Sequence, residues 1–297
     1  MNIKRNHNKK YFFSKSNGIV LNVFFAMILT LLIVHSILLI YPFVWLINNS
    51  LKTNFEYITT NSMSLPTNYQ WQHYVDVFTA FTVKNVSYLE MTFNSVWFSV
   101  LTTVISTFMS CVVAYTVAKY NFKLKNLVYW LIMFTMMFPV YGAGAAAYKQ
   151  LFTLKLYDSP LLLIKSAGGY GGFQFLLLYS FFVSLPKDYM EAAEIDGAGQ
   201  FRIFLTIMLP MAIGPISAIA VTTFIGSWNN YMTAIVELPS YPGLATGVYL
   251  YEKAMANGMN YPMFYTGTFL ATIPVFIIFI CFSDIFLSNM SIGGLKG

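Results

Sequence analysis

Six long apolar stretches, each nearly free of charged side chains, constrain this sequence more than any other feature. They cover residues 19–47, 91–118, 127–148, 161–184, 203–228 and 263–287. A helix needs ~20 apolar residues to cross the hydrocarbon core of a bilayer, and every stretch reaches that length. Charged residues make up 9% of the chain, against roughly 25% in soluble domains. The sequence therefore predicts an all-α, polytopic membrane protein with six transmembrane helices, and it excludes a water-soluble globular domain.

The fourth stretch is interrupted by Lys165 and by a glycine cluster between Ser166 and Gly172. Each glycine destabilises a helix by about 1 kcal/mol relative to alanine. We therefore expect a short outer helix, a break at the glycines and then the membrane span proper. Broken helices in a membrane need cover from protein or from a water-filled cavity.

Lysine and arginine are distributed unevenly between the two sets of connections. The set that includes both termini carries eleven of them and the other set carries six. Because cytoplasmic connections are enriched in these residues, both termini are predicted to be cytoplasmic. Residues 57–75 lack charge but are too polar for lipid, so they belong to an aqueous loop. The expected layout is a cytoplasmic tail at 1–18, a six-helix domain at 19–288 with outer loops 48–90 and 229–262 and a cytoplasmic loop 185–202, and a cytoplasmic tail at 289–297.

The cytoplasmic loop before the fifth stretch has the signals of a helix, a turn and a second helix. Pro186 suits a first helical turn, Asp188 favours the positive end of the helix dipole, and Gly197 or Gly199 suits a left-handed C-terminal cap. Small residues flanked by acidic ones offer a surface that another protein could approach closely. The residues of this surface are Glu191, Ala192, Ala193, Glu194 and Asp196.

This loop carries the residues of a known motif. Glu191-Ala192-Ala193 is followed by Gly197, then Ile207, then Leu209-Pro210. At this spacing the sequence resembles the permease subunits of type I ATP-binding-cassette (ABC) importers for sugars. The resemblance extends to Tyr41-Pro42, Ser50-Leu51-Lys52, Asn94-Ser95, Ile195-Asp196-Gly197-Ala198 and Trp228-Asn229. Residues 290–297 are similar to the tail of the maltose and alginate permeases, so we expect a complete chain.

The resemblance implies the six-helix fold of these permeases, in the bacterial cytoplasmic membrane. It implies that the Glu191 loop is a coupling helix seated in an ATPase subunit, and that Gly293, Gly294 and Lys296 lie near the ATPase subunits. The implied partners are two ATPase subunits, a second homologous permease, an extracytoplasmic solute-binding protein and an oligosaccharide. ATP and magnesium would be bound by the ATPase subunits, and this chain would hold no cofactor.

The residues themselves agree with a transport subunit that has no catalytic site. No Gly-Lys dipeptide occurs, so the chain holds no P-loop. Cys111 and Cys281 both lie in apolar stretches, which predicts neither a disulfide nor a metal site. There is no zinc-protease or nucleophile-elbow motif. Five of the cations crowd at the N-terminus as a topology signal, so we expect no nucleic acid partner.

A sugar path should combine aromatic faces with hydrogen-bonding groups. The same residue types also form interfacial belts and hold helices together, so each candidate has an ordinary structural alternative. The outer-face lysines Lys149, Lys155 and Lys165 would suit an acidic, uronate-containing oligosaccharide, such as an alginate- or glycosaminoglycan-type fragment. The candidates for the path are Asn94, Gln174, Tyr179, Trp228, Asn229, Asn230 and Tyr231, with Tyr249, Tyr251 and Tyr265 beside them.

An ion-coupled secondary sugar carrier, or a channel, is the alternative function. A carrier needs ionisable groups within the membrane. The six stretches offer only His35, Lys165 and Asp284, and the last two lie near the ends of their stretches.

Overall fold

The computed structural model describes residues 15–137, 144–169, 171–255, 258 and 260–290. The described chain is helical apart from one two-stranded antiparallel hairpin, which agrees with the all-α prediction. The elements are α1 (Lys15–Ser50), α2 (Asn54–Thr59), α3 (His73–Ala80), β1 (Thr82–Val83), β2 (Val86–Ser87), α4 (Tyr88–Lys119), α5 (Lys125–Met137), α6 (Gly144–Thr153), the 3-10 helix η1 (Pro160–Gly168), α7 (Phe173–Ser184), α8 (Asp188–Ile195), α9 (Gln200–Ile203), the π-helical turn η2 (Phe204–Met208), α10 (Leu209–Met211), α11 (Ile213–Trp228), α12 (Met232–Val236), α13 (Leu244–Ala254) and α14 (Tyr261–Met290).

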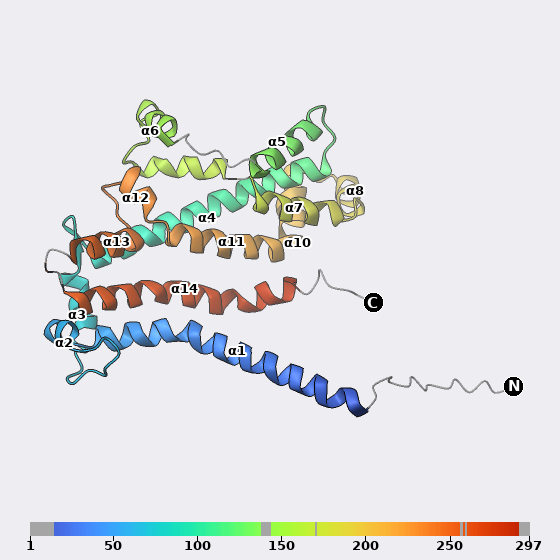
Figure 1. The fold of residues 1–297 in the computed structure, drawn as a ribbon. Helices are drawn as coiled ribbons and strands as arrows, with labels where there is room; N and C mark the ends of the chain where they lie inside the picture. The colour runs from blue at the N-terminus through green and yellow to red at the C-terminus, as the bar shows by residue number, and fades with distance from the viewer. Residues whose placement is uncertain (1–14, 138–143, 170, 256–257, 259, 291–297) are drawn as a thin grey trace.

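Three of the described helices, α1, α4 and α14, are each long and apolar enough to cross a membrane. Two bent pairs, η1 with α7 and α9–α10 with α11, bring the number of candidate spans to five. The predicted span 127–148 falls on α5 and α6, which lie toward opposite ends of the bundle (Figure 1), while residues 138–143 are outside the described part of the chain. The structure is consistent with the six-span prediction.

Helix α4 is the centre of the bundle and packs against η1, α7 and α11. Its packed faces are unusually polar, because small hydroxyl side chains repeat along them. Small residues let neighbouring helix backbones approach closely within a membrane. The Ser110 hydroxyl, for example, donates a hydrogen bond to the carbonyl of Ser106, one turn earlier in the helix, at 2.8 Å. The buried hydroxyl residues of α4 are Ser95, Ser99, Thr103, Ser106, Thr107 and Ser110.

The predicted break in the fourth span is confirmed. η1 and α7 meet at an angle of 53°, and Gly172 precedes α7 with a φ of +75°, a conformation that glycine adopts without steric cost.

The predicted fifth span, 203–228, is bent near its start. Its straight segment begins at Ile213, after a bend of 78° from the preceding helices, and the two parts together form one of the candidate spans. Proline explains the bend, because Pro215 has no N–H to donate to a carbonyl in the preceding turn. Pro215 lies instead in the first turn of α11, where the N–H groups lack partners in any case.

The outer loop 48–90 is folded, although the sequence predicted only an aqueous loop. α2 and α3 pack against α14, and the Tyr57 and Tyr265 hydroxyls lie 2.5 Å apart. Lys52 is fully buried, and its ammonium donates to the carbonyls of Asn61 and Ser62 at 3.1 and 3.2 Å. A buried lysine is thus the centre around which this loop closes.

Figure 1 shows α14 between α1 and the rest of the bundle, with α1 diverging from it toward the N-terminus. The two helices meet where Phe43 and Phe276 place their ring centroids 5.1 Å apart. Most of α1 is exposed, including His35, and the start of α1 and the end of α14 lie at the same end of the molecule as α8.

Candidate functional site

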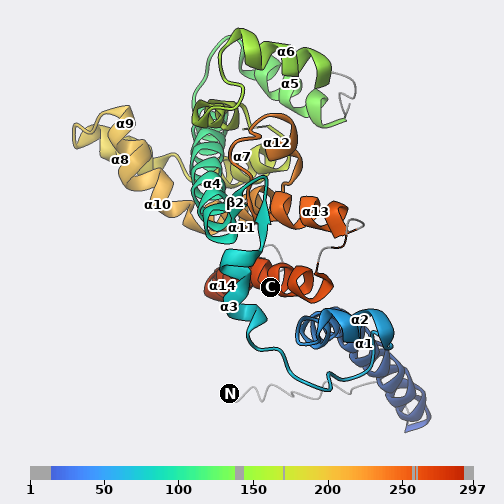
Figure 2. The same cartoon turned by 90° about the vertical axis from the view of Figure 1, so that its left-hand side faces the viewer.

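Helices α8, α9 and α10 form an arm that projects from the bundle (Figure 2), as the predicted helix, turn and helix. Gly197 ends α8 with a φ of +78°. The N–H of Ala198 donates to the carbonyl of Ala193 at 2.9 Å, and the N–H of Gly197 donates to that of Glu194 at 3.0 Å. These two bonds define a Schellman cap. Gly199, the other candidate, has an ordinary φ of −72° and begins α9.

The acidic residues of the arm face solvent, but its two neighbouring alanines differ in exposure. Glu191, Ala192 and Asp196 are exposed, whereas Ala193 is buried against the bundle beside Met190. Ala193 therefore does not contribute to an exposed surface, contrary to the prediction. The side chain of Glu194 accepts a hydrogen bond from the Gln200 amide at 2.6 Å.

Two apolar side chains on the arm were missed from the sequence. Ile195 is 86% exposed and Phe201 is 71% exposed. Their signal was an apolar residue inside an otherwise polar loop. Exposed apolar side chains on a polar arm are typical of a protein contact. Two other residues of the motif, Ile207 and Leu209, pack against the hydrophobic core. Pro210 is exposed beside the bend.

The arm is tied to the end of α4. Lys119 donates its ammonium to the carbonyl of Leu185, the residue that caps α7 just before the arm, at 2.6 Å. The Tyr120 hydroxyl donates to the Gln200 side-chain oxygen at 2.6 Å, so that Tyr120, Gln200 and Glu194 form a continuous chain of hydrogen bonds. A displacement of the arm would thus act on α4 directly.

A cavity of about 340 Å³ lies against the middle of α4, between α4, η1, α11 and α12. Its wall is rich in hydroxyl groups, which donate and accept hydrogen bonds. One of them, the Ser227 hydroxyl, is buried and has no hydrogen-bond partner among the described residues. The polar groups of the wall are Thr102, Ser106, Lys165, Ser166, Thr223, Ser227, Asn230, Thr233 and Glu237.

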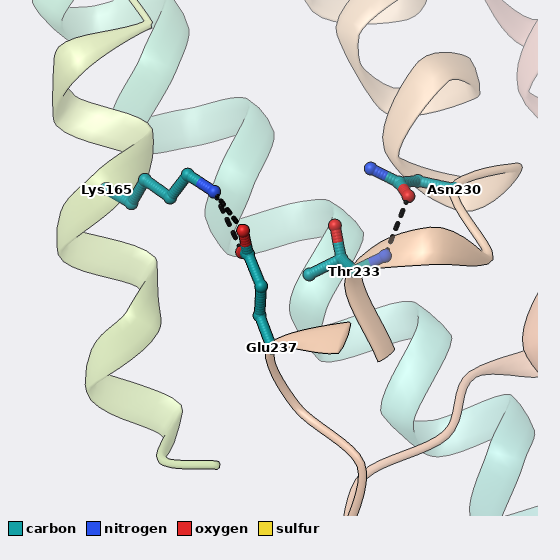
Figure 3. Close-up of polar contacts among 4 residues, drawn as sticks. All are labelled: Lys165, Asn230, Thr233 and Glu237. Carbon is teal, nitrogen blue, oxygen red and sulfur yellow. Dashed lines mark hydrogen bonds and ion pairs between the residues drawn. The ribbon is translucent and has the colours of Figure 1, made fainter. Parts of the chain in front are cut away.

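An ion pair spans the wall of this cavity (Figure 3). The Lys165 ammonium on η1 lies 2.5 and 2.8 Å from the two carboxylate oxygens of Glu237, which ends α12. Beside it, the Asn230 side-chain oxygen accepts a hydrogen bond from the Thr233 N–H at 3.1 Å and so holds the start of α12. The Lys165 side chain is 55% exposed and that of Glu237 is 18% exposed.

A second set of bonds holds the same two segments together. The Asp158 N–H donates to the carbonyl of Glu237 at 2.9 Å, and the Asp158 carboxylate accepts from the N–H and the hydroxyl of Ser240 at 2.9 and 2.6 Å. Asp158 adopts a φ of +50°, which is uncommon for a non-glycine residue. The chain before η1 and the chain after α12 are thus joined next to the Lys165–Glu237 pair.

The structure brings together only part of the predicted sugar path. Asn230 lines the cavity, and Asn94 and Trp228 line a much smaller adjoining pocket. Gln174 holds helices together: its amide donates to the Thr223 hydroxyl at 2.8 Å and its oxygen accepts from Ser110 at 3.1 Å.

The remaining candidates lie elsewhere. Tyr179 packs between Tyr129 and Phe175, Asn229 and Tyr231 line a separate apolar groove, and Tyr249 stacks on Tyr231. Tyr251 stacks on Phe81, and Tyr265 contacts Tyr57. Lys149 and Lys155 are exposed outside the cavity. The tail residues Gly293, Gly294 and Lys296, and the side chain of Asp284, are outside the described part of the chain.

The hydroxyls of the cavity wall and Glu237 were missed from the sequence. Thr223, Ser227 and Asn230 share one face of α11 and its end, at spacings of four and three residues. That spacing is the signal that could have found them. Among the described residues there is no cluster of three or more His, Cys, Asp or Glu side chains that could hold a metal ion.

Comparison with known proteins gives one family match. Residues 106–291 match the family model described as "Binding-protein-dependent transport system inner membrane component". These residues include the arm and most of the cavity wall.

Several curated proteins are similar over most of their length. The diacetylchitobiose uptake system permease protein NgcG of Streptomyces coelicolor is 29% identical, covering 90% of this chain and 87% of that protein. The arabinooligosaccharides transport system permease protein AraQ of Bacillus subtilis is 29% identical over 94% of this chain and 96% of that protein. AraQ of Halalkalibacterium halodurans is 30% identical over 69% of this chain and 73% of that protein.

One solved structure shares the fold. A chain in the crystal structure of a bacterial ABC transporter involved in the import of the acidic polysaccharide alginate superposes with a TM-score of 0.74 at 21% identity. The match covers 92% of this chain and 98% of that chain.

Proposed function

Because this chain belongs to the family of binding-protein-dependent transport system inner membrane components, we propose that it is the permease subunit through which an ATP-driven importer moves an oligosaccharide. The observation that carries the proposal is that one family match contains both the arm and the hydroxyl-lined cavity. The relatives named for diacetylchitobiose and arabinooligosaccharide transport support a carbohydrate cargo.

The chain is a multi-pass membrane protein, and the arm is its proposed link to the energy source. Two ATPase subunits bind ATP and magnesium, and the exposed Glu191, Ile195 and Phe201 dock into one of them. The tail residues Gly293, Gly294 and Lys296 lie close to the same subunits. Both termini and the arm face the cytoplasm, while the loops 48–90 and 229–262 face outward, toward a solute-binding protein.

The movement proposed for the arm reaches the cavity through α4. When the ATPase subunits close, the arm moves, and the hydrogen bond from Tyr120 to Gln200 carries that displacement to the end of α4. This chain and a second homologous permease then alternate between two states around the sugar path. In the cavity, hydroxyl groups and Asn230 bind the hydroxyls of the sugar. No covalent chemistry is assigned to this chain.

Uptake into proteoliposomes tests the proposal. The permease, its partner permease, the ATPase subunits and the solute-binding protein are reconstituted together, and labelled neutral and acidic oligosaccharides are supplied. ATP-dependent uptake that survives an uncoupler supports the importer. Uptake that needs an ion gradient would instead indicate a secondary carrier, and current without ATP in a planar bilayer would indicate a channel.

Docking is tested separately. Glu191→Ala and Ile195→Ser should reduce copurification of the ATPase subunit and sugar uptake, while membrane insertion is retained. Leu124→Ser is the matched control, because Leu124 is also an exposed apolar residue, at 60%, but lies in the connection before α5. Undiminished uptake in both arm variants would refute the docking role.

A further inference from the structure

The charge of the cavity wall distinguishes between two kinds of sugar. Of the lining residues, Lys165 and Glu237 are the charged ones, and they are paired with each other. The formal charges of the wall therefore cancel. A hydroxyl-rich wall with no net charge suits a polar but uncharged ligand.

Lys165 has little capacity left for a second anion. Its ammonium already contacts both oxygens of Glu237, at 2.5 and 2.8 Å. A substrate carboxylate that accepted the third N–H of Lys165 would lie beside the Glu237 carboxylate and be repelled by it, and one that displaced Glu237 would leave an unpaired side chain that is only 18% exposed. An unpaired, largely buried carboxylate is unfavourable, so that exchange is opposed.

The other charged groups near the pair lie outside the cavity wall. Asp158 is hydrogen-bonded to the backbone of the segment that carries Glu237 and to Ser240. Asp158 does not line the cavity, and neither do the exposed Lys149 and Lys155. The charge that a ligand meets at the wall is therefore that of the Lys165–Glu237 pair.

We propose that the Lys165–Glu237 ion pair makes this cavity selective for uncharged oligosaccharides over uronate-containing ones. The inference deepens the proposed function and rests on it, because it assumes that the cavity is part of the sugar path. It departs from the acidic cargo that the outer lysines suggested: Lys165 is the only one of those three lysines in the cavity wall, and its charge is satisfied within the protein.

The test compares two sugars that differ in a single group. One is the oligosaccharide taken up in the assay above. The other has the same sugar units but differs at their primary carbon: a neutral oligosaccharide is oxidised there to carboxylates, and a uronate-containing one is reduced there to alcohols. One member of the pair is therefore neutral and the other is acidic. Binding of each to the purified complex in nanodiscs, without the solute-binding protein, is measured by saturation-transfer NMR. This removes the selectivity of the solute-binding protein from the result.

Three variants vary only the charges. The wild-type complex should bind the neutral sugar about tenfold more tightly than the acidic one. This is the difference expected when the carboxylate of the acidic sugar finds no charged hydrogen-bond partner. Glu237→Gln frees Lys165 and should remove most of that preference. Lys165→Gln leaves Glu237 unpaired and should strengthen the preference. The double swap Lys165→Glu with Glu237→Lys restores the pair and should return the wild-type ratio.

The outcomes separate this inference from the proposed function. An unchanged ratio in Glu237→Gln, or a wild-type complex that favours the acidic sugar, overturns the inference alone. Equal loss of both sugars in Glu237→Gln, with recovery in the double swap, also overturns it, because the pair would then only position η1 against α12. Absence of ATP-dependent uptake of any oligosaccharide overturns the proposed function itself.

Discussion

The backbone N–H of Ala198 donates to the carbonyl of Ala193 at 2.9 Å, and this bond closes the end of the arm's first helix. It forms only because Gly197, between them, turns the chain with a φ of +78°. The bond fixes where the exposed Ile195 and Asp196 lie relative to the rest of the arm. The geometry of the docking surface therefore depends on one backbone conformation.

Gly197→Ala should loosen this cap. An L-residue pays about 1 kcal/mol or more in the left-handed region, although the added Cβ would meet open space. We expect faster hydrogen exchange of the Ala198 amide, by about fivefold, and weaker ATPase copurification. Gly199→Ala is the matched control, since Gly199 has a φ of −72° and open space around it. Equal effects of the two substitutions would contradict this role.

Tyr120→Phe should impair coupling. It keeps the ring, which packs against Tyr115 at 5.6 Å between centroids, and removes the hydrogen bond to Gln200. One such bond contributes about 1 kcal/mol. We expect less sugar transported per ATP hydrolysed, with ATPase copurification retained.

A double-mutant cycle checks that explanation. Gln200→Leu should reproduce the effect of Tyr120→Phe, and the combination should add little, because both changes break the same chain of hydrogen bonds. Fully additive losses would show that the two residues act independently.

Ser227→Ala should affect the sugar more than the fold. The Ser227 hydroxyl is buried at the cavity wall without a partner among the described residues, so its removal should change stability by less than about 0.5 kcal/mol. We expect a several-fold higher half-saturation for uptake at an unchanged melting temperature of the complex.

Ser217→Ala serves as the control on the same helix. Its hydroxyl donates to the carbonyl of Ile213 at 2.7 Å within α11, away from the cavity wall. Uptake by this variant should match that of the wild type. A melting temperature that falls in Ser227→Ala without any change in uptake would assign Ser227 to packing.

Lys52→Met should destabilise the outer loop by about 1–3 kcal/mol, because the charged hydrogen bonds from the ammonium to the carbonyls of Asn61 and Ser62 are lost. Burial lowers the pKa of Lys52 below its usual 10.5, an effect that Glu56 partly offsets. The unfolded loop therefore binds more protons than the folded loop between that lowered pKa and 10.5, and stability rises with pH in this window. The melting temperature of the wild type should increase relative to Lys52→Met as the pH approaches 10, and a decrease would contradict the assignment.

Much of the architecture was readable from the sequence because its causes are local. Spans follow from runs of apolar residues, the arm follows from Gly197 and the charges around it, and the broken fourth span follows from its glycines. The bend in the fifth span was not predicted, because the apolar pattern runs on through Pro210 and Pro215 and hydrophobicity does not show that their N–H groups are missing. The sequence placed the loop 48–90 in water but did not predict its fold, because nothing local to Lys52 shows that this cation is buried.

The polar interior depends on which helices come together. Gln174 looked like a sugar ligand in the sequence, but α4 and α11 place Ser110 and Thr223 within its reach. Lys165 looked like a free cation, yet it pairs with Glu237, 72 residues away along the chain. The sequence by itself determined the membrane class, the apolar segments and the arm, because each depends on neighbouring residues. Only the tertiary structure decided which polar groups remain open to a ligand, because the partner of a side chain is set by contacts between segments distant in the sequence.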